Sequence, residues 1–320
     1  MPSFPGMPYG AAPSICFPLT EFCMYFLFVF CVMHALKQGT RHVSYLLGGI
    51  LFGLILEYVN VISNFGYTYG EFTIMLGRAP FNIPLCIGVG WGVIIYTARL
   101  FSDRLGLPLW SAVALDALLA ISIDLSMDAV AYRLHLWHWN WKGTGLNPLT
   151  ADWFGVPFGN FFGWLMVVFF YSSTSRFFEK IFLNQQKPIR TKLALVPILS
   201  ILLSQVFLYL MLVYVDHFLL TQFGITALHR FIAFLAVLIL ITIRGLRKMK
   251  PVAQTLPFIV WLIPVWFHLY FFAWLFAGGF YKENVWLVFA AAINLVMGVG
   301  IHTVNFERKH PLFTLQKQSV

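Results

Sequence analysis

Three carboxylates interrupt one apolar segment of the chain, at Asp116, Asp124 and Asp128. The chain has only 12 Asp and Glu among its 320 residues, so this grouping needs a physical reason. A carboxylate at membrane depth costs at least ~2.5 kcal/mol on insertion scales and normally faces a bundle interior or a polar cavity. Asp124 and Asp128 are four residues apart and would lie one above the other on one face of a helix. This pair is the first candidate for acid chemistry.

A second polar stripe lies on the segment 43–62 and just beyond it, where Glu57, Asn60 and Asn64 follow the i, i+3, i+7 spacing of one helix face. If this segment runs in the same direction as the one that carries the aspartate pair, Glu57 reaches the depth of that pair. Glu21, near the start of the first apolar segment, is expected at a comparable depth. Carboxyl groups crowded together in a low dielectric do not all ionise. A carboxyl group that keeps its proton can act as a general acid.

The composition places these acids in a membrane. Hydrophobic residues make up 60% of the chain, charged residues make up 10%, and 34 residues are Phe. A soluble globular protein does not have this composition, so we predict an all-α, polytopic bundle in which residues 1–320 form a single membrane domain. A bilayer is crossed by ~20 apolar residues, and stretches of this kind predict nine spans, at 17–36, 43–62, 83–101, 108–129, 155–176, 193–215, 226–244, 257–277 and 284–304.

The distribution of basic residues predicts the orientation of the bundle. Lys and Arg exceed Asp and Glu by nine (21 against 12), but they lie in short loops between apolar stretches, so we expect no nucleic-acid partner. With nine spans, most basic residues fall on one side, and cytoplasmic loops hold the excess of Lys and Arg. They are the sixteen residues Lys37, Arg41, Arg99, Arg104, Arg176, Lys180, Lys187, Arg190, Lys192, Arg244, Arg247, Lys248, Lys250, Arg308, Lys309 and Lys317. The N-terminus is therefore expected outside and the C-terminus in the cytosol.

Two non-cytosolic connections, 63–82 and 130–154, are long and rich in Trp and Tyr. Aromatic residues of this kind anchor at the headgroup level, and we predict that the two connections form a lid over the acidic residues. An interfacial belt without a catalytic part is the alternative. Within the lid, His135 and His138 could bind a metal, but the repeated His boxes of membrane di-iron oxygenases are absent, so we expect no metal.

A longer series of polar, aromatic and glycine residues covers about residues 50–170. It consists of Glu57, Asn64-Phe65-Gly66-Tyr67, Tyr69, Pro84, Gly90-Trp91, Tyr96, Asp124-Leu125, Met127-Asp128, Arg133-Leu134, Leu136-Trp137, Trp139, Phe154-Gly155-Val156-Pro157, Asn160-Phe161 and Gly163-Trp164. This order resembles the integral-membrane carotenoid biosynthesis family, which includes hydratases that add water to the terminal isoprenoid double bond of acyclic carotenoid ends. Two positions depart from the family pattern: Ala129 stands where Pro is expected, and Gly159 stands where Ser is common. The last four spans, about 193–305, carry none of these motifs and indicate only that the protein crosses the membrane several times.

The residues and the resemblance together assign the site. Catalytic positions are Asp124, Asp128, Glu57 and Asn160. Asn160 follows Pro157, which suits the first turn of a helix, so its amide is expected at the level of the aspartate pair, where it can hold water or orient a carboxylate. Glu57 is the candidate to accept the proton of that water. Substrate-binding positions are Asn60, Asn64, Tyr67, Trp91, Asp116, Arg133, Trp137, Phe154 and Trp164.

The resemblance also implies what the reaction requires. Hydration of a trisubstituted alkene needs a positioned acid, a site that tolerates a tertiary cation and a held water molecule. It needs no redox cofactor, so neither a cofactor nor a metal is expected. The expected partners are a carotenoid or another long isoprenoid lipid, membrane lipids and other enzymes of the pathway. The expected location is the plasma membrane of a bacterium or archaeon.

Three other functions remain open at the level of sequence. A membrane prenyltransferase of the lycopene elongase type would use the Asp124-x-x-x-Asp128 spacing to hold magnesium and a diphosphate, although no second aspartate-rich motif follows. An isoprenoid cyclase would share the protonated-alkene cation. A proton-coupled lipid transporter would use the acids as a proton relay, although no inverted repeat favours it.

Overall fold

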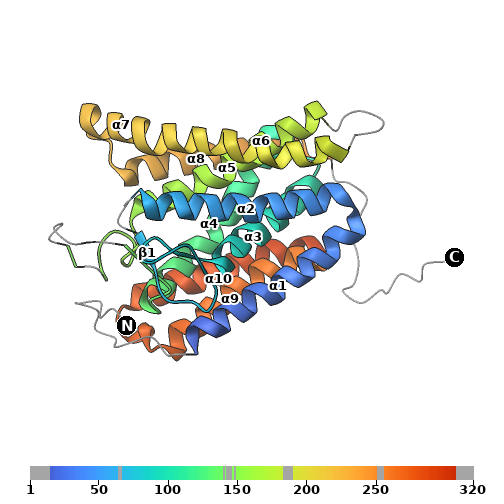
Figure 1. Ribbon diagram of the computed structural model, residues 1–320. Helices are drawn as coiled ribbons and strands as arrows, with labels where there is room; N and C mark the ends of the chain where they lie inside the picture. Colours follow the sequence, from blue (N-terminus) through green and yellow to red (C-terminus); the bar gives the residue numbers. More distant parts are fainter. Residues whose placement is uncertain are drawn as a thin grey trace.

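The computed structural model describes residues 15–63, 67–139, 141, 146–147, 149–182, 190–250 and 256–307. Within these ranges the chain forms an all-α bundle of nine long helices (Figure 1). They are α1 (Cys16–Gln38), α2 (Thr40–Ile62), α3 (Leu85–Arg104), α4 (Leu109–Arg133), α5 (Phe158–Phe182), α6 (Arg190–Tyr209) continued by the π-helical turn η1 (Leu210–Val215) and by α7 (Asp216–Phe223), α8 (Ala227–Leu246), α9 (Phe258–Ala277) and α10 (Val285–Glu307). The fold class is therefore confirmed, and each predicted span corresponds to one long helix.

Seven of the nine helices in the described ranges, all except α4 and α5, are long and apolar enough to cross a membrane. The helix that carries the three aspartates, α4, lies at the centre of the bundle and contacts α3, α5, α8, α9 and α10 (Figure 1). Because protein rather than lipid surrounds it, α4 can hold polar side chains that a lipid-facing helix could not.

Short strands join the two connections that the sequence assigned to a lid. Strand β1 (Tyr67–Tyr69) pairs antiparallel with β4 (Trp137–Trp139), so that Tyr67 lies opposite Trp139 and Tyr69 lies opposite Trp137. Strand β2 (Met75–Leu76) pairs with β3 (Ile83–Pro84) within the first connection. The β1–β4 pair closes over the ends of α2 and α4.

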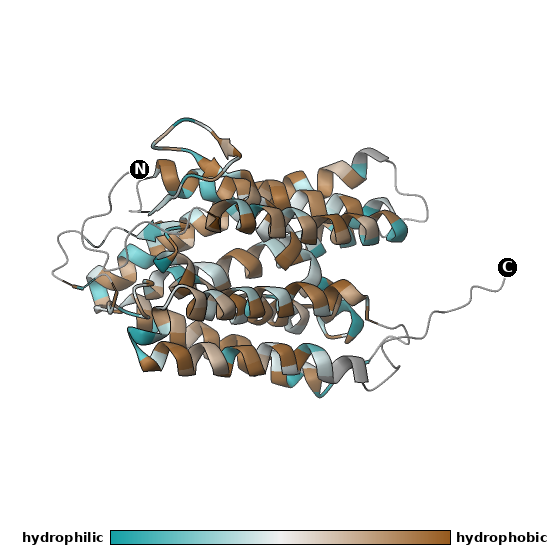
Figure 2. Ribbon diagram, turned by 90° about the horizontal axis from the view of Figure 1, so that it is seen from below, coloured by the Kyte–Doolittle hydropathy of each residue, from teal (hydrophilic) through white to brown (hydrophobic). Residues whose placement is uncertain are grey.

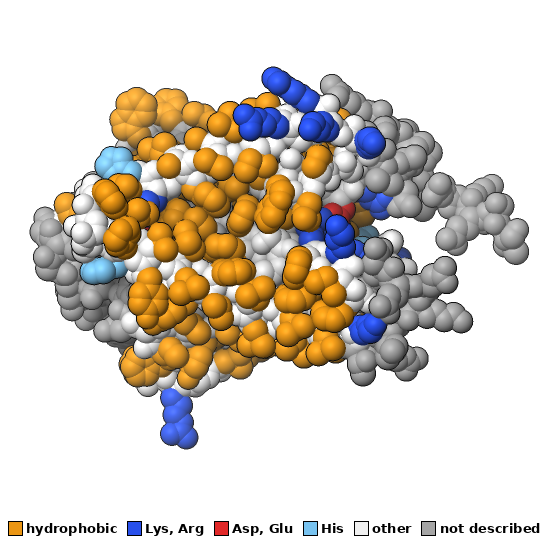
Figure 3. Space-filling model, turned by 90° about the horizontal axis from the view of Figure 1, so that it is seen from above, with side chains coloured by type: hydrophobic (Ala, Val, Ile, Leu, Met, Phe, Trp, Pro, Cys, Tyr) orange, Lys and Arg blue, Asp and Glu red, His pale blue; other side chains and the backbone are white. Residues whose placement is uncertain are grey.

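The surface separates into an apolar middle and more polar ends. Hydrophobic residues run along the helices, and hydrophilic residues gather towards the loops (Figure 2). On the face shown in Figure 3, hydrophobic side chains cover the middle, and most of the visible Lys and Arg side chains lie near the end away from β1. This arrangement is that of a multi-pass membrane protein. Which end faces the cytosol remains a prediction.

Candidate active site

A cavity of about 370 Å³ lies under the β1–β4 pair, between α2, α3, α4 and α5. Eight of the thirteen predicted site residues line it: Glu57, Asn60, Tyr67, Trp91, Asp128, Trp137, Asn160 and Trp164. Its remaining lining is mostly apolar and aromatic. A cavity of this size, with apolar walls and a few convergent polar groups, is typical of a site for a small organic ligand or for the end of a larger one.

Asn160 joins the two aspartates of α4. Its side-chain Nδ2 donates to Asp128 Oδ2 at 2.6 Å and to Asp124 Oδ2 at 3.1 Å. Helix α5 begins at Phe158, directly after Pro157, and the backbone N–H of Asn160 bonds to the Pro157 carbonyl, so the amide is fixed in the first turn. Asp128 lines the cavity, whereas Asp124 lies behind it and is fully buried.

Glu57 faces the same cavity from α2 and is held by Trp91. The indole Nε1 of Trp91 donates to Glu57 Oε1 at 2.7 Å. Trp91 also packs on Trp164, with ring centroids 4.1 Å apart and planes tilted by 33°. Gly53 permits this arrangement, because a Cβ at that position would lie only 2.5 Å from the Cβ of Trp91. The close approach of α2 and α3 thus fixes both the carboxylate and the aromatic wall.

Two tyrosines of the lid stand above the acidic residues. The hydroxyl of Tyr67 donates to that of Tyr69 at 3.2 Å. Burial raises the pKa of both phenols well above the ordinary value, and the nearby carboxylate of Glu57 raises the pKa of each further. Both hydroxyls therefore stay protonated at neutral pH. Because Tyr67 donates its proton to Tyr69, its hydroxyl oxygen brings a hydrogen-bond acceptor to the cavity wall.

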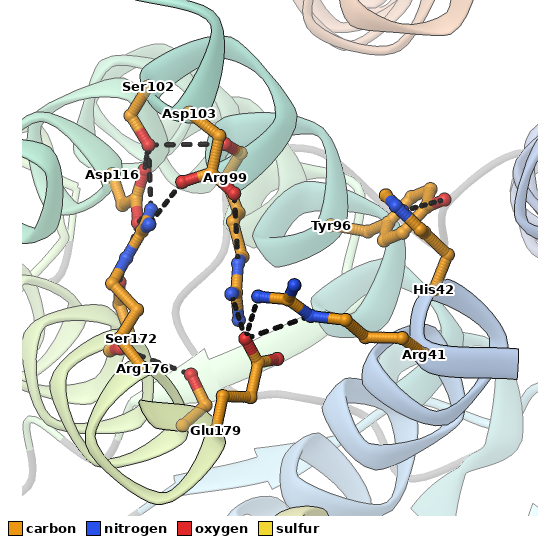
Figure 4. A network of polar contacts seen from close by, with 11 residues as sticks. Arg41, His42, Tyr96, Arg99, Ser102, Asp103, Asp116, Ser172, Arg176 and Glu179 are labelled. Carbon is orange, nitrogen blue, oxygen red and sulfur yellow. Dashed lines mark hydrogen bonds and ion pairs between the residues drawn. The ribbon is translucent and has the colours of Figure 1, made fainter. Parts of the chain in front are cut away.

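Asp116 lies elsewhere in the bundle, in a buried network with Arg176 (Figure 4). Its carboxylate accepts hydrogen bonds from Ser102 and Ser172, both at 2.5 Å, and from Arg176 Nη2 at 2.8 Å. It precedes Asp124 by eight residues, which corresponds to ~12 Å along a helix. The structure therefore does not place Asp116 on the cavity. Its hydrogen bonds to Ser102, Ser172 and Arg176 indicate a structural role.

Arg133 and Phe154 also lie outside the cavity lining. The Arg133 guanidinium is fully buried and pairs with Glu283 at 2.5 Å. It also donates to the carbonyl oxygens of Ala129 at 2.7 Å and Phe154 at 2.8 Å. Arg133 thus links the end of α4 to the lid and to the turn between α9 and α10. Phe154 contributes to this link through its backbone carbonyl and not through its ring.

Two further expectations concern α1 and the first connection. Glu21 accepts hydrogen bonds from the backbone N–H groups of Thr73 at 2.8 Å and Ile74 at 3.0 Å, so it anchors the first connection and is not part of the cavity lining. Asn64, a predicted substrate-binding residue, lies outside the described residues.

His135 and His138 have ring centroids 5.2 Å apart in the lid. Among the described residues, no group of three or more His, Cys, Asp or Glu side chains is arranged to hold a metal ion.

The far wall of the cavity comes from α7 and α8, which carry none of the predicted site residues. Asp216 and Arg230 line it and form an ion pair at 2.6 Å. Asp216 is the only acid between residues 180 and 282. The rarity of acids in apolar segments, which singled out the aspartates of α4, therefore applies to this residue as well.

Comparison with known protein families gives a match that covers most of the chain. No curated protein and no solved structure matches the chain significantly. The family described as "Carotenoid biosynthesis protein" matches residues 20–241, which are 222 of the 320 residues. The match is wider than the motif region of about 50–170, and it includes the cavity wall at Asp216 and Arg230. The chain therefore belongs to the carotenoid biosynthesis protein family, as a multi-pass membrane protein with a role in that pathway.

Proposed function

We propose that the protein is a hydratase that adds water to the terminal isoprenoid double bond of an acyclic carotenoid. The single observation that carries the proposal is the hydrogen bonding of one amide, that of Asn160, to both Asp124 and Asp128, in a cavity that Glu57 also lines. Such a site offers a proton donor, an orienting amide and a proton acceptor, and these are the groups that hydration of an alkene needs.

Asp128 is the proton donor in this proposal, because it lines the cavity and Asp124 does not. Its proton passes to the less substituted carbon of the terminal double bond. The π bond breaks, a C–H bond forms, and the positive charge remains on the more substituted carbon as a tertiary cation. Asp124, four residues away on the same helix face, supports Asp128 through the shared amide of Asn160.

The aromatic wall lowers the free energy of the cation. Trp91 and Trp164 line the cavity from α3 and α5, and Trp137 lines it from the lid. A cation over the face of an indole ring gains about 0.5–2 kcal/mol, with the higher value in a desolvated site. Acyclic terpenoid cations are reactive, and this stabilisation helps the site to hold the cation until water attacks it.

Glu57 accepts the proton of the attacking water. The water oxygen forms the new C–O bond and gives one proton to the carboxylate that Trp91 holds in place. When that proton returns to the aspartate pair through water in the same cavity, the enzyme regains its starting state. The sum is the addition of one water molecule, and no oxidant or reductant enters the balance.

Expression in a lycopene-producing bacterium tests the proposal. The expected product is a carotenoid heavier than lycopene by one water, or by two if both ends react. A product heavier by an isoprenoid unit would indicate a prenyltransferase instead. A product of unchanged mass with a different absorption spectrum would indicate a cyclase or an isomerase, and unaltered lycopene in cells that contain the folded protein would oppose the proposal.

A further inference from the structure

The cavity has a buried end and an exposed end. Met24, Trp91 and Phe267 form the buried end, with exposed fractions of 6%, 5% and 2%. At the other end, Gly159 of α5 is exposed and Asn60 of α2 is partly exposed. The lid covers the route along the bundle axis, since Trp137 lines the cavity and is only 5% exposed. The cavity is partly open, and the exposed Gly159 lies with Leu212, Asp216 and Ala227 in its lining. We therefore place its mouth where α5 meets η1, α7 and α8.

The helix beside this mouth leaves the bundle. On α6 the buried residues are Val196, Ser200, Ile201, Ser204 and Leu208. In η1 and α7, all of whose residues the structure describes, none is buried. Yet Leu212 and Asp216 line the cavity. The η1–α7 segment therefore borders the mouth without filling it, and π-helical turns such as η1 frequently occur at functional sites. In Figure 1, α7 lies at the edge of the bundle, at the end where β1 lies.

Helix α5 presents a strip without side chains to the same mouth. Gly159 and Gly163 are four residues apart, so they lie on one face of α5, and both line the cavity. A Cβ at Gly163 would meet no described atom within 4 Å, and a Cβ at Gly159 would meet only Ala227 Cβ, at 3.9 Å. The two glycines leave an open groove between α5 and the η1–α7 segment.

An ion pair holds the far wall of this groove. Arg230 pairs with Asp216 at 2.6 Å and donates to the Ile225 carbonyl at 2.5 Å, so that α7 and α8 stay joined. The guanidinium also lies over the ring of Phe162, 5.9 Å from its centroid. Since the two charges neutralise each other, the groove does not require a charged ligand. Beside this ion pair the cavity is lined by the apolar residues Phe162, Leu212 and Ala227.

We infer that the groove over Gly159 and Gly163 is the binding groove of an isoprenoid chain and opens laterally to the bilayer. The isoprenoid chain enters from the lipid between α5 and η1–α7. Its end reaches Asp128, and the remainder of the isoprenoid lies along Gly159 and Gly163. The identity of the reacting end rests on the proposed hydratase function. An isoprenoid hydrocarbon is dissolved in the bilayer core, and the exposed side chains of Leu210, Tyr214 and Phe218 place η1 and α7 against that core.

The first test closes the groove. A Leu side chain at position 163 has room in front of its Cβ, so Gly163→Leu is expected to fold and to fill the groove. In liposomes that contain lycopene, turnover should fall by about tenfold or more, a loss of ~1.4 kcal/mol in transition-state stabilisation. Gly300→Leu is the matched control, because Gly300 of α10 also has no described atom within 4 Å of an added Cβ. It should keep its turnover. Unchanged turnover in Gly163→Leu would overturn the inference.

The second test observes occupancy without catalysis. A nitroxide spin label on Leu212→Cys would report from the groove wall, and the four native cysteines, Cys16, Cys23, Cys31 and Cys86, are buried. The label should collide with oxygen dissolved in the bilayer rather than with a water-soluble nickel complex. Added lycopene should slow its motion, and Gly163→Leu should abolish that effect.

The two tests separate this inference from the proposed function. Immobilisation of the label by lycopene without any hydrated product would leave the groove supported and the hydratase proposal refuted. Hydration without immobilisation would refute the groove and leave the hydratase proposal standing. A label already immobile in phospholipid alone, and unaffected by lycopene, would mean that acyl chains or a second protein copy occupy the groove, and would overturn the inference.

Discussion

The amide nitrogen of Asn160 lies 2.6 Å from Asp128 Oδ2, although the two residues are 32 positions apart and on different helices. The amide donates this hydrogen bond and a second one to Asp124, so that one side chain orients both carboxyl groups. The acidic pair of α4 is therefore held from α5, and the proposed proton transfer depends on this contact.

Asp128→Asn should abolish turnover, with a loss of at least ~10³-fold, because an amide cannot supply the proton. Asp124→Asn should also inactivate the enzyme, through the support that Asp124 gives to Asp128. Turnover of lycopene by purified protein in liposomes measures both effects. Glu71→Gln is the control, since Glu71 is an exposed acid of the first connection. Full activity of both aspartate variants at normal expression would remove the pair from the mechanism.

Asn160→Leu should lower the hydration rate strongly while carotenoid still co-purifies with the protein. The substitution removes the donor to both aspartates and puts an apolar side chain of similar size in its place at the cavity wall. The measurement compares turnover with the amount of bound pigment. Loss of pigment in step with loss of activity would make Asn160 a binding or structural residue instead.

Trp91→Phe separates the positioning of Glu57 from the aromatic wall. It removes the N–H that bonds to Glu57 Oε1 but retains a ring against Trp164. We expect kcat to fall by about tenfold with little change in KM, the pattern of an interaction made chiefly in the transition state. Glu57→Gln should lower kcat at least as much. Trp110→Phe, on an exposed side chain of α4, serves as the control. A change confined to KM would argue that Trp91 binds substrate and does not position the carboxylate.

Asp116 should act on stability rather than on chemistry. Asp116→Ala removes the buried partner of the Arg176 guanidinium and leaves it only the half-exposed Asp103. Breaking a buried pair costs about 3–5 kcal/mol. Thermal unfolding in detergent should therefore shift to lower temperature. The double variant Asp116→Ala/Arg176→Met should regain part of the loss, because it also removes the buried charge that has lost its Asp116 partner. A stable Asp116→Ala protein that has lost turnover would instead place Asp116 in the chemistry.

The local pattern of the sequence predicted much of this arrangement. Apolar stretches indicated all nine long helices, helical spacing placed Asp124 and Asp128 on one face, and Pro157 located Asn160 in the first turn of α5. The pairing of Asp116 with Arg176 joins residues 60 positions apart, and the pairing of Asp216 with Arg230 depends on how α7 folds back onto α8. Contacts of this kind follow from tertiary packing, and they cannot be predicted from the periodicity of one segment.

The pairing of the lid strands also could not be predicted from the sequence. Its aromatic composition predicted that the two connections cover the site, but the register of Tyr67 against Trp139 is set by backbone hydrogen bonds between distant segments. The open groove was also hidden from sequence analysis. Gly159 was noted only as a departure from the family pattern, and the space in front of Gly163 is visible only when α7 is in place.

The orientation of the bundle can be tested by cysteine labelling. Lys282, at the lid end, should react from outside the cell when changed to Cys, and Lys248, at the other end, should react only from the cytosolic side. The reason is the sixteen-to-five distribution of Lys and Arg, in which the smaller group is Arg78, Arg133, Lys142, Arg230 and Lys282. Labelling of the Lys282→Cys protein from the cytosol alone would invert the assignment and place the active site near the inner face.

Isotope incorporation tests the central claim most directly. Purified protein in liposomes would receive lycopene in heavy-oxygen D2O, and the product would be examined by mass spectrometry and NMR. The account predicts one solvent oxygen on the more substituted carbon and one deuterium on its neighbour for each hydrated end, and neither label with Asp128→Asn. A product without solvent oxygen, or equal incorporation by the Asp128→Asn protein, would contradict it.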